Sequence, residues 1–297
     1  MSRVKEPQIA LPYVTEGVRK PTDIEIRAGS RIIVGDALKV LGGIESGTFR
    51  CSVTSPPYWG LRDYKIQEQI GAEEELETYI NNRREIFLEV RRVLTLDGTL
   101  WLNLGDSYTS GNRTWRAADR KNPARGMSYR PPTPQGLKPK DLIGVPWRVA
   151  FALQTDGWFL RSDIIWHKPN TQPESVKDRP TRAHEYIFLF SKSDKYYYNH
   201  DKIREPANSH GKSRNKRTVW TVNTESFPGA HFATFPPKLI EPCILAGSET
   251  GDMVLDPFFG SGTVGEVCLR TGRKFVGIEI KEEYARLARE RLGWERF

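Results

Sequence analysis

The sequence of 297 residues predicts an α/β fold with a mainly parallel sheet and helices on both of its faces. Short apolar runs that suit buried strands alternate with longer segments whose apolar residues recur at helical spacing. Such alternation is typical of strand–helix–strand units, in which the strands lie parallel. Two runs near residues 185–198 lack an intervening helix, so we expect an antiparallel hairpin at one edge of the sheet.

Three strands and one long helix are expected before residue 105. Residues 31–34 and 49–53 are short apolar runs, and residues 99–104 form a third run after the Asp97-Gly98 turn. Residues 76–94 place seven apolar side chains on one helical face: Tyr79, Ile80, Ile86, Phe87, Val90, Val93 and Leu94. That face is expected to pack against the sheet.

The second half of the chain continues the alternation. Pro146 suits the first turn of a helix that runs to residue 154, and a strand follows at residues 159–166. The hairpin is expected from residues 185–190 and 196–198. The C-terminal part is predicted as a helix, a strand, a helix, a strand and a last helix, at residues 237–246, 253–255, 264–270, 274–280 and 281–292.

Composition sets limits on the class of protein. Apolar residues make up 38% of the chain, which suffices for a buried core, and no run approaches the 18 apolar residues of a membrane span. Residues 1–23 are polar and contain proline, so we expect a flexible N-terminal arm before a single domain at 24–297. The three cysteines are widely spaced and odd in number, which suits a reducing cytoplasm and gives no metal-binding pattern.

The net charge of +8 is concentrated in two segments that read as loops. Residues 107–140 carry eight Lys or Arg and one acid, and residues 199–220 carry six and two. Basic loops suit contacts with the phosphates of a nucleic acid, so we expect DNA-contacting insertions at 107–140 and 199–228. The expected contacts are Arg113, Arg116, Arg120, Lys121, Arg125, Lys212, Arg214, Lys216 and Arg217.

The strand at 49–53 ends abruptly in Ser55-Pro56-Pro57-Tyr58. Each proline fixes its own φ and removes a backbone donor, and Pro57 also restricts Pro56. The result is a stiff loop with free carbonyl groups and an aromatic ring at its tip. Such a loop can hold a flat heterocycle that bears an amine, because oxygens accept from the amine while Tyr58 stacks on the ring. The alternative is an ordinary proline-rich turn.

A second motif joins the strand at 253–255 to the helix at 264–270. It reads Asp256-Pro257-Phe258-Phe259-Gly260-Ser261-Gly262-Thr263, and glycines at such a turn let a ligand approach the backbone. Glu279 follows Asp256 by 23 residues, near the end of the next strand. An acid at that spacing in a Rossmann-like unit reaches ribose hydroxyls, so the motif predicts a nucleoside site.

Residues 54–58 and 256–265 resemble the catalytic and cofactor motifs of the amino-group DNA methyltransferases that use S-adenosylmethionine. The catalytic motif comes first, as in the circularly permuted β group of that family. Serine at position 55, where other members have aspartate, resembles the N4-cytosine branch. The similarity extends from about residue 31 to the C-terminus and implies a circularly permuted class I methyltransferase fold.

The resemblance implies roles for individual residues. The Ser55 hydroxyl and the Pro56 carbonyl would hold the amine of a flipped cytosine, Pro57 would fix the loop, and Tyr58 would stack on the base. Asp256 and the turn would frame the methionine end of the cofactor, while Glu279 would bind its ribose. The full set of expected cofactor contacts is Asp36, Phe235, Asp256, Pro257, Phe258, Gly260, Ser261, Gly262, Thr263, Glu279 and Ile280.

The same resemblance implies partners and leaves alternatives open. Double-stranded DNA is the expected substrate, and a cognate restriction endonuclease is compatible with the family, as is a monomer or a homodimer. N6-adenine methylation is the nearest alternative, since serine at position 55 does not exclude a purine. A binding protein without turnover is a second alternative. Methylation of cytosine carbon-5 needs a nucleophilic cysteine, for which Pro242-Cys243 is the candidate. This pair lies in an apolar helical stretch, however, and that chemistry would leave residues 55–58 without a role.

Overall fold

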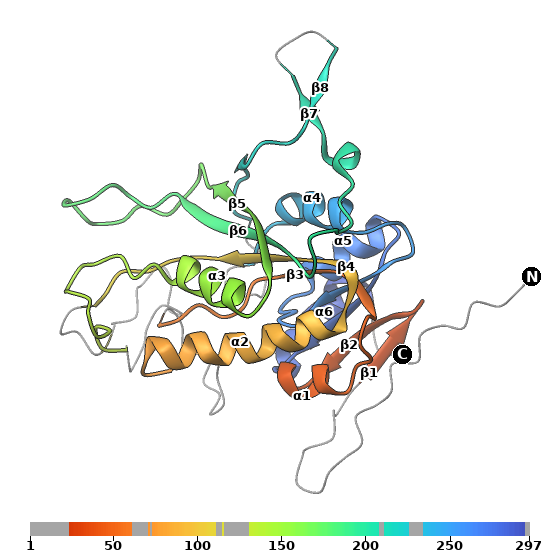
Figure 1. The fold of residues 1–297 in the computed structure, drawn as a ribbon, viewed down its shortest axis with the longest axis horizontal. Coiled ribbons are helices and arrows are strands. Elements are labelled where there is room, and N and C mark those ends of the chain that lie inside the picture. Colours follow the sequence, from red (N-terminus) through yellow and green to blue (C-terminus); the bar gives the residue numbers. More distant parts are fainter. Residues whose placement is uncertain are drawn as a thin grey trace, which may run out of the picture.

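The computed structural model describes residues 24–60, 71, 73–110, 115, 131–207, 211–225 and 234–294. Within these residues, a nine-stranded sheet has the order β1-β2-β11-β10-β3-β4-β6-β5-β9 (Figure 1). The strands are β1 (Ile24–Arg27), β2 (Ser30–Val34), β3 (Phe49–Thr54), β4 (Leu94–Leu104), β5 (Phe159–His167), β6 (His184–Ser191), β9 (Val219–Thr221), β10 (Met253–Asp256) and β11 (Lys274–Glu279). A separate pair joins β7 (Glu205–Pro206) to β8 (Ser213–Arg214).

Parallel pairing dominates one side of the sheet and antiparallel pairing the other. Strands β2, β11, β10, β3 and β4 are parallel neighbours. Strand β6 runs antiparallel to both β4 and β5, and β1 is antiparallel to β2. The predicted fold class, a mainly parallel sheet with an antiparallel part, is therefore confirmed.

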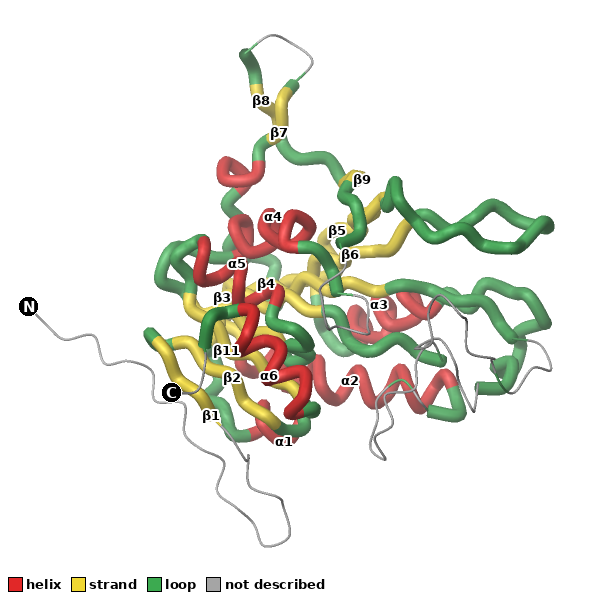
Figure 2. The backbone as a smooth tube through the Cα atoms, turned by 180° about the vertical axis from the view of Figure 1, so that it is seen from behind, coloured by secondary structure: helices red, strands yellow, loops and turns green. Residues whose placement is uncertain are grey.

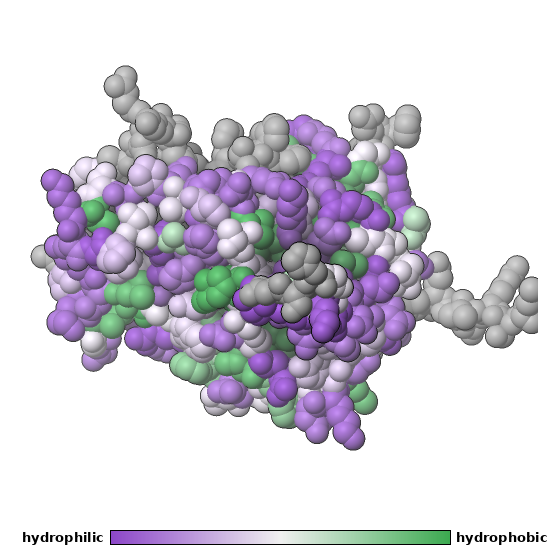
Figure 3. Space-filling view, turned by 90° about the horizontal axis from the view of Figure 1, so that it is seen from above, coloured by the Kyte–Doolittle hydropathy of each residue, from purple (hydrophilic) through white to green (hydrophobic). Residues whose placement is uncertain are grey.

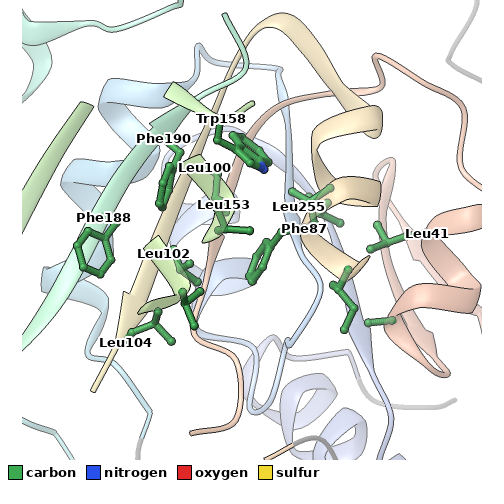
Figure 4. Packing of buried hydrophobic residues seen from close by; sticks show 14 of the residues in the cluster. Leu41, Phe87, Leu100, Leu102, Leu104, Leu153, Trp158, Phe188, Phe190 and Leu255 are labelled. Atoms are coloured by element: carbon green, nitrogen blue, oxygen red, sulfur yellow. The ribbon is translucent and has the colours of Figure 1, made fainter. Parts of the chain in front are cut away.

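Two helical layers cover the sheet, as the views from both sides show (Figures 1 and 2). Helices α1 (Ala37–Gly42), α2 (Leu76–Val93) and α3 (Val145–Thr155) pack on one face, where Leu41, Phe87 and Leu153 share one apolar cluster with Leu100 and Phe190 of the strands (Figure 4). Helices α4 (Pro237–Gly247), α5 (Thr263–Arg270) and α6 (Glu282–Arg291) share a second apolar cluster with the other face. A short 3-10 turn, η2 (His200–Ile203), contacts α4.

Helix α3 begins where the sequence predicts, and the reason is local. Pro146 occupies its first turn, where a missing backbone donor costs nothing. The carboxylate of Asp106 accepts from the backbone amides of Gly144 and Val145, each at 3.0 Å.

The apolar face predicted for residues 76–94 is confirmed. All seven of its side chains, on α2 and at the start of β4, are buried.

The predicted hairpin of residues 185–190 and 196–198 is wrong in its second strand. Strand β6 pairs with β4 and β5, whereas residues 196–198 form no strand. Their rings are used in packing: Tyr198 stacks on Trp101 with a centroid distance of 6.2 Å, and Arg50 lies 5.1 Å from the Tyr197 ring. An aromatic run that suits a strand is here held by ring contacts.

Other differences concern short elements. Strand β4 starts at Leu94, before the predicted Asp97-Gly98 turn, and α1 and β1 were not expected. The segment 199–228, expected as a loop, contains η2, β7, β8 and β9 among its described residues. The N-terminal arm at 1–23 lies outside the described residues. No helix in the described part of the chain is long and apolar enough to span a bilayer.

Candidate active site

The direction in which successive strands are added to the sheet reverses between β10 and β3, at its centre. From β10 it continues through α5 to β11 on one side, and from β3 through α2 to β4 on the other side. Ligands of open α/β sheets bind at such a switch point, outside the carboxyl ends of the strands. The loop after β3 and the turn after β10 meet there.

A buried hydrogen bond joins these two segments directly. The hydroxyl of Thr54 donates to Asp256 Oδ1 at 2.6 Å, although the residues are 202 positions apart. The register of β3 and β10 places Cys51 beside Val254, so both strands reach the edge together. The same carboxylate oxygen accepts from the backbone amide of Phe258 at 3.0 Å. The motifs at 55–58 and 256–263 are therefore neighbours in space.

The loop Ser55–Tyr58 is supported from α2. The carbonyl of Pro57 accepts from the Tyr79 hydroxyl at 3.0 Å and lies 3.5 Å from Arg83 Nη2. Arg83 is fully buried and lies over the rings of Tyr79 and Phe258, at 4.5 and 5.6 Å. Because Tyr79 and Arg83 hold this carbonyl, the loop has little freedom to shift along the sheet edge.

The hydroxyl of Tyr58 lies within a cluster of polar side chains. Its hydroxyl donates to Glu185 Oε2 at 2.8 Å and lies 3.2 Å from Asn103 Oδ1 and 3.3 Å from Ser55 Oγ. Glu185 forms an ion pair with Lys168. Burial, followed by the negative charge of Glu185, holds the pKa of Tyr58 well above its ordinary value. The phenol is therefore neutral over the physiological pH range.

The glycine turn is braced from α6 and β11. Gly262 has φ of 80°, which other residues rarely adopt, and a Cβ there would lie 2.9 Å from the Ala288 Cβ. Arg291 donates to Ser261 Oγ at 3.2 Å and Thr263 Oγ1 at 2.8 Å. These contacts fix the start of α5, whose first backbone amides have no acceptor within the helix.

Two carboxylates lie at this edge, on neighbouring strands. Asp256 and Glu279 are 1% and 8% exposed, and Glu279 accepts from the backbone amides of Gly260 and Lys281 at 2.8 and 2.9 Å. Burial raises the pKa of each to about 7. The positively charged methionine end and the ribose hydroxyls of an adenosyl sulfonium suit these acceptors, so the residues present fit such a group.

The remaining predicted cofactor residues lie around the turn. Asp36 follows β2 and caps α1, accepting from the Lys39 amide at 3.0 Å, and the neighbouring Gly35 amide bonds to the Glu279 carbonyl at 2.9 Å. Pro257 is buried, Phe258 is half-buried, and Ile280 is exposed directly after Glu279. Phe235 is half-buried and precedes α4. Their roles toward a ligand stay predictions.

The predicted DNA contacts divide into two groups. Arg113, Arg116, Arg120, Lys121 and Arg125 lie outside the described residues. Lys212, Arg214, Lys216 and Arg217 lie on or beside the hairpin of β7 and β8, which projects from the body (Figure 1). The face seen from above is largely hydrophilic, with small separate hydrophobic patches (Figure 3). Such a surface suits a polar partner.

Glu205 holds two of these arginines. Its Oε1 accepts from Arg214 Nε at 3.0 Å and from Arg217 Nε at 2.7 Å. Lys216 Nζ lies 5.0 Å from the centre of the Trp220 ring. The hairpin therefore presents an ordered set of cations.

Cys243 does not suit the carbon-5 chemistry. It is fully buried in α4, and burial raises the pKa of its thiol well above the ordinary value. A buried, protonated thiol is a poor nucleophile.

Most of the supporting side chains were not predicted as part of the site. They act through contacts that are distant in sequence: Tyr79, Arg83, Asn103, Lys168, Glu185 and Arg291. Thr54 lies within the motif 54–58, but its bond to Asp256 was not predicted. Asn103 carried one usable signal, because an amide within the apolar run 101–104 must find partners when buried. The others look like ordinary surface or core residues in the sequence.

Residues 49–290 match the family N6_N4_Mtase, described as DNA methylase. The type II methyltransferase M.Cfr9I of Citrobacter freundii is 60% identical over 284 residues, which are 96% of this chain and 94% of that protein. M.SmaI of Serratia marcescens is 64% identical over 263 residues, covering 88% and 90% of the two chains.

Two solved structures are similar over most of the chain. TTHA0409 of Thermus thermophilus, in complex with S-adenosyl-L-methionine, has a TM-score of 0.60 and 27% identity, covering 88% of this chain and 91% of that one. The PvuII DNA methyltransferase, described as cytosine-N4-specific, has a TM-score of 0.66 and 22% identity, covering 86% and 84%. At 22% identity, the second likeness is one of fold.

Proposed function

The chain belongs to the DNA methylase family, and from that premise we propose that it methylates the N4 amine of a cytosine flipped out of duplex DNA. Its matches to type II methyltransferases over nearly their whole length support a DNA amino-methyltransferase that uses S-adenosylmethionine. The N4-cytosine choice rests on Ser55, which stands where other branches of the family have aspartate. The type II names of these relatives also favour a cognate restriction endonuclease.

One observation carries the proposal. The Thr54–Asp256 hydrogen bond of 2.6 Å fixes the loop that would hold the base against the turn that would hold the cofactor. Methyl transfer between two bound groups depends above all on their alignment. A direct, buried bond between the two segments that bind them provides that alignment.

The residues of the chain position the amine and exclude water. Bound S-adenosylmethionine supplies an electrophilic methyl group on its sulfonium. The Ser55 hydroxyl and the Pro56 carbonyl accept hydrogen bonds from the cytosine amine and aim its lone pair. Tyr79 and Arg83 hold the adjacent Pro57 carbonyl. The amine loses its proton after transfer, so no strong general base is required at this site.

The cofactor would lie along the turn after β10. Asp256 and the backbone of residues 260–263 would frame its methionine part, where the start of α5 favours the carboxylate. Glu279 would accept from the ribose hydroxyls, and Asp36 from the adenine amine. Phe258, Ile280 and Phe235 would pack around the adenine.

Access to the base requires extrusion from the duplex, because its amine is paired there. The hairpin of β7 and β8 would contact the phosphate backbone through Lys212, Arg214, Lys216 and Arg217. The second basic insertion, at 107–140, is proposed to share in DNA contact.

The product identifies the reaction. DNA from a host without its own methylation, expressing this protein, is digested to nucleosides and analysed by mass spectrometry. We expect N4-methylcytosine, absent when Tyr58→Ala replaces the native protein. N6-methyladenine would overturn the choice of base, and unmodified DNA would overturn the proposed activity. Sequencing of the same DNA maps the methylated site.

A further inference from the structure

Tyr58, at the tip of the loop 55–58, is held both through the loop backbone and through its hydroxyl. The prolines and the Pro57 carbonyl contacts fix its backbone, while the Tyr58 hydroxyl is anchored at the start of β6 by Glu185 at 2.8 Å. We propose that Glu185 is a positioning residue that sets the Tyr58 ring as the stacking surface for the target base. This inference rests on the function proposed above.

Both oxygens of Glu185 are engaged. Oε2 accepts from Tyr58 and from Asn103 Nδ2 at 3.2 Å, and Oε1 pairs with the Lys168 ammonium. Asn103 is itself fixed by the Tyr186 carbonyl at 3.0 Å. The carboxylate therefore has one orientation, and the phenol oxygen has one place to lie.

Lys168 forms an ion pair with this acceptor where both side chains have low exposure. The two side chains are 15% and 17% exposed, so the pair offsets the cost of removing each charge from water. Lys168 is held in turn, because its ammonium lies 4.0 Å from the centre of the Trp166 ring. A carboxylate supported in this way does not swing out into solvent.

The surroundings leave room for one arrangement of the ring. A Cβ at Gly105 would come within 2.7 Å of Tyr58 Cε2 and 3.2 Å of the Glu185 carboxyl carbon. Position 105 thus lies against the ring and its anchor together, and the lack of a side chain there lets them meet. An aromatic platform for a flipped base needs a fixed plane, and these contacts provide it.

The proposal predicts a specific kinetic effect. Glu185 has no described contact with the Gly260–Thr263 turn or the hairpin of β7 and β8. Its removal should therefore leave cofactor and DNA affinity close to native while kcat falls. Misplacement of a reacting group by about 1 Å costs about 10²-fold in rate, which sets the expected size for Glu185→Ala.

The test uses the full chain and a duplex with 2-aminopurine at the target position of the mapped site. In the native complex we expect the flipped probe to be quenched by stacking on Tyr58. Glu185→Ala should brighten it several-fold and lower kcat, with unchanged affinity for S-adenosylhomocysteine. Glu185→Gln keeps an acceptor for the phenol and should restore most of both signals. Glu174→Gln, which breaks the Glu174–Arg179 ion pair away from this cluster, is the matched control.

A double-mutant cycle separates positioning from a general decrease in stability. If Glu185 acts through the Tyr58 hydroxyl, adding Glu185→Ala to Tyr58→Phe should have little further effect on kcat. Additive effects, or a Glu185→Ala probe as dark as the native one, would overturn the role of Glu185 alone. A probe that stays dark both with the native protein and with Tyr58→Ala, which lacks the quenching ring, has remained stacked in the duplex. That result would instead overturn base flipping, and the inference with it.

Discussion

The carboxyl edge of β3 and β10 and the hairpin of β7 and β8 hold their polar groups in opposite ways. At the edge, Thr54 and Asp256 are 0% and 1% exposed and share a direct hydrogen bond. Beside the hairpin, the Arg217 side chain is 67% exposed and shares Glu205 with Arg214. The first arrangement fixes geometry, and the second presents charge.

The energetics differ accordingly. A buried hydrogen bond to a charged group contributes about 1.5–3 kcal/mol, and leaving one partner unsatisfied costs at least as much. An exposed ion pair contributes about 0–1 kcal/mol and is screened by salt. Single changes at the edge should therefore be severe, whereas changes on the hairpin should be small and cumulative.

Two glycines test this difference with the same substitution. Gly262 and Gly211 have φ of 80° and 75°, so alanine is strained at both by about 1–2 kcal/mol. A Cβ meets Ala288 at 2.9 Å in the first case and nothing within 4 Å in the second. We expect Gly262→Ala to lower methylation by about 10²-fold through displacement of the turn, and Gly211→Ala to leave it within a few-fold. Equal effects in a methylation assay would contradict the comparison.

The carboxylates at the edge predict a pH dependence of cofactor binding. The pKa values of Asp256 and Glu279 are raised to about 7, while the cationic cofactor favours their ionised forms. Cofactor affinity should therefore rise as the pH increases through 7. Below pH 7, each carboxyl group contributes up to about a tenfold change in affinity per pH unit. Calorimetric titration with S-adenosylmethionine, which carries the sulfonium charge that S-adenosylhomocysteine lacks, measures this slope between pH 6 and 8.5.

The same shifts affect the free protein in the opposite sense. A carboxyl whose pKa is raised on folding binds more protons in the native state. The free energy of unfolding therefore falls as pH rises from the unfolded pKa, about 4, to the folded pKa, about 7.

Two variants test the pH dependence of cofactor affinity. Asp256→Asn should flatten the affinity slope, because only Glu279 then titrates at the edge. Thr54→Val removes a donor that lowers the Asp256 pKa, and should move the slope to higher pH. A slope that neither variant alters would show that other groups cause it.

The hairpin should show the smallest effect per residue. Reversal of Arg214, Lys216 and Arg217 to glutamate should weaken DNA binding and flatten its dependence on salt, by about 0.9 in logarithmic slope for each phosphate that the variant no longer neutralises. Fluorescence anisotropy over a salt series gives both quantities. Lys195→Glu, at an exposed turn after β6, is the control. If the triple variant keeps the native DNA affinity and salt slope, this hairpin is not part of the DNA interface.

The two regions also differ in how far the sequence predicts them. The motifs at 55–58 and 256–263 have residue types and order that the chemistry requires, and the sheet brings them together through Thr54 and Asp256. Helices α2 and α3 were predicted because their apolar spacing and Pro146 are local signals. The family resemblance is confirmed by the match over residues 49–290.

Contacts across the sheet could not be predicted in this way. The partners of Tyr58 come from β4 and β6, and their meeting depends on the register of Leu102 with Phe188 and Leu104 with Tyr186. Residues 196–198 have strand-like composition, yet ring packing against Trp101 decides their path. The hairpin has charge but no fixed motif. Its composition therefore indicates an anionic partner, but it does not predict that Glu205 pairs with the arginines.

A crystal structure with S-adenosylhomocysteine and a duplex containing the mapped site tests the central claim most directly. We predict the target cytosine outside the helix on the Tyr58 ring, with its amine about 2.7–3.2 Å from the Pro56 carbonyl, a normal hydrogen-bond range, and facing a cofactor held at Gly260–Thr263. A base that stays stacked in the duplex, or a cofactor bound away from this turn, would contradict the account.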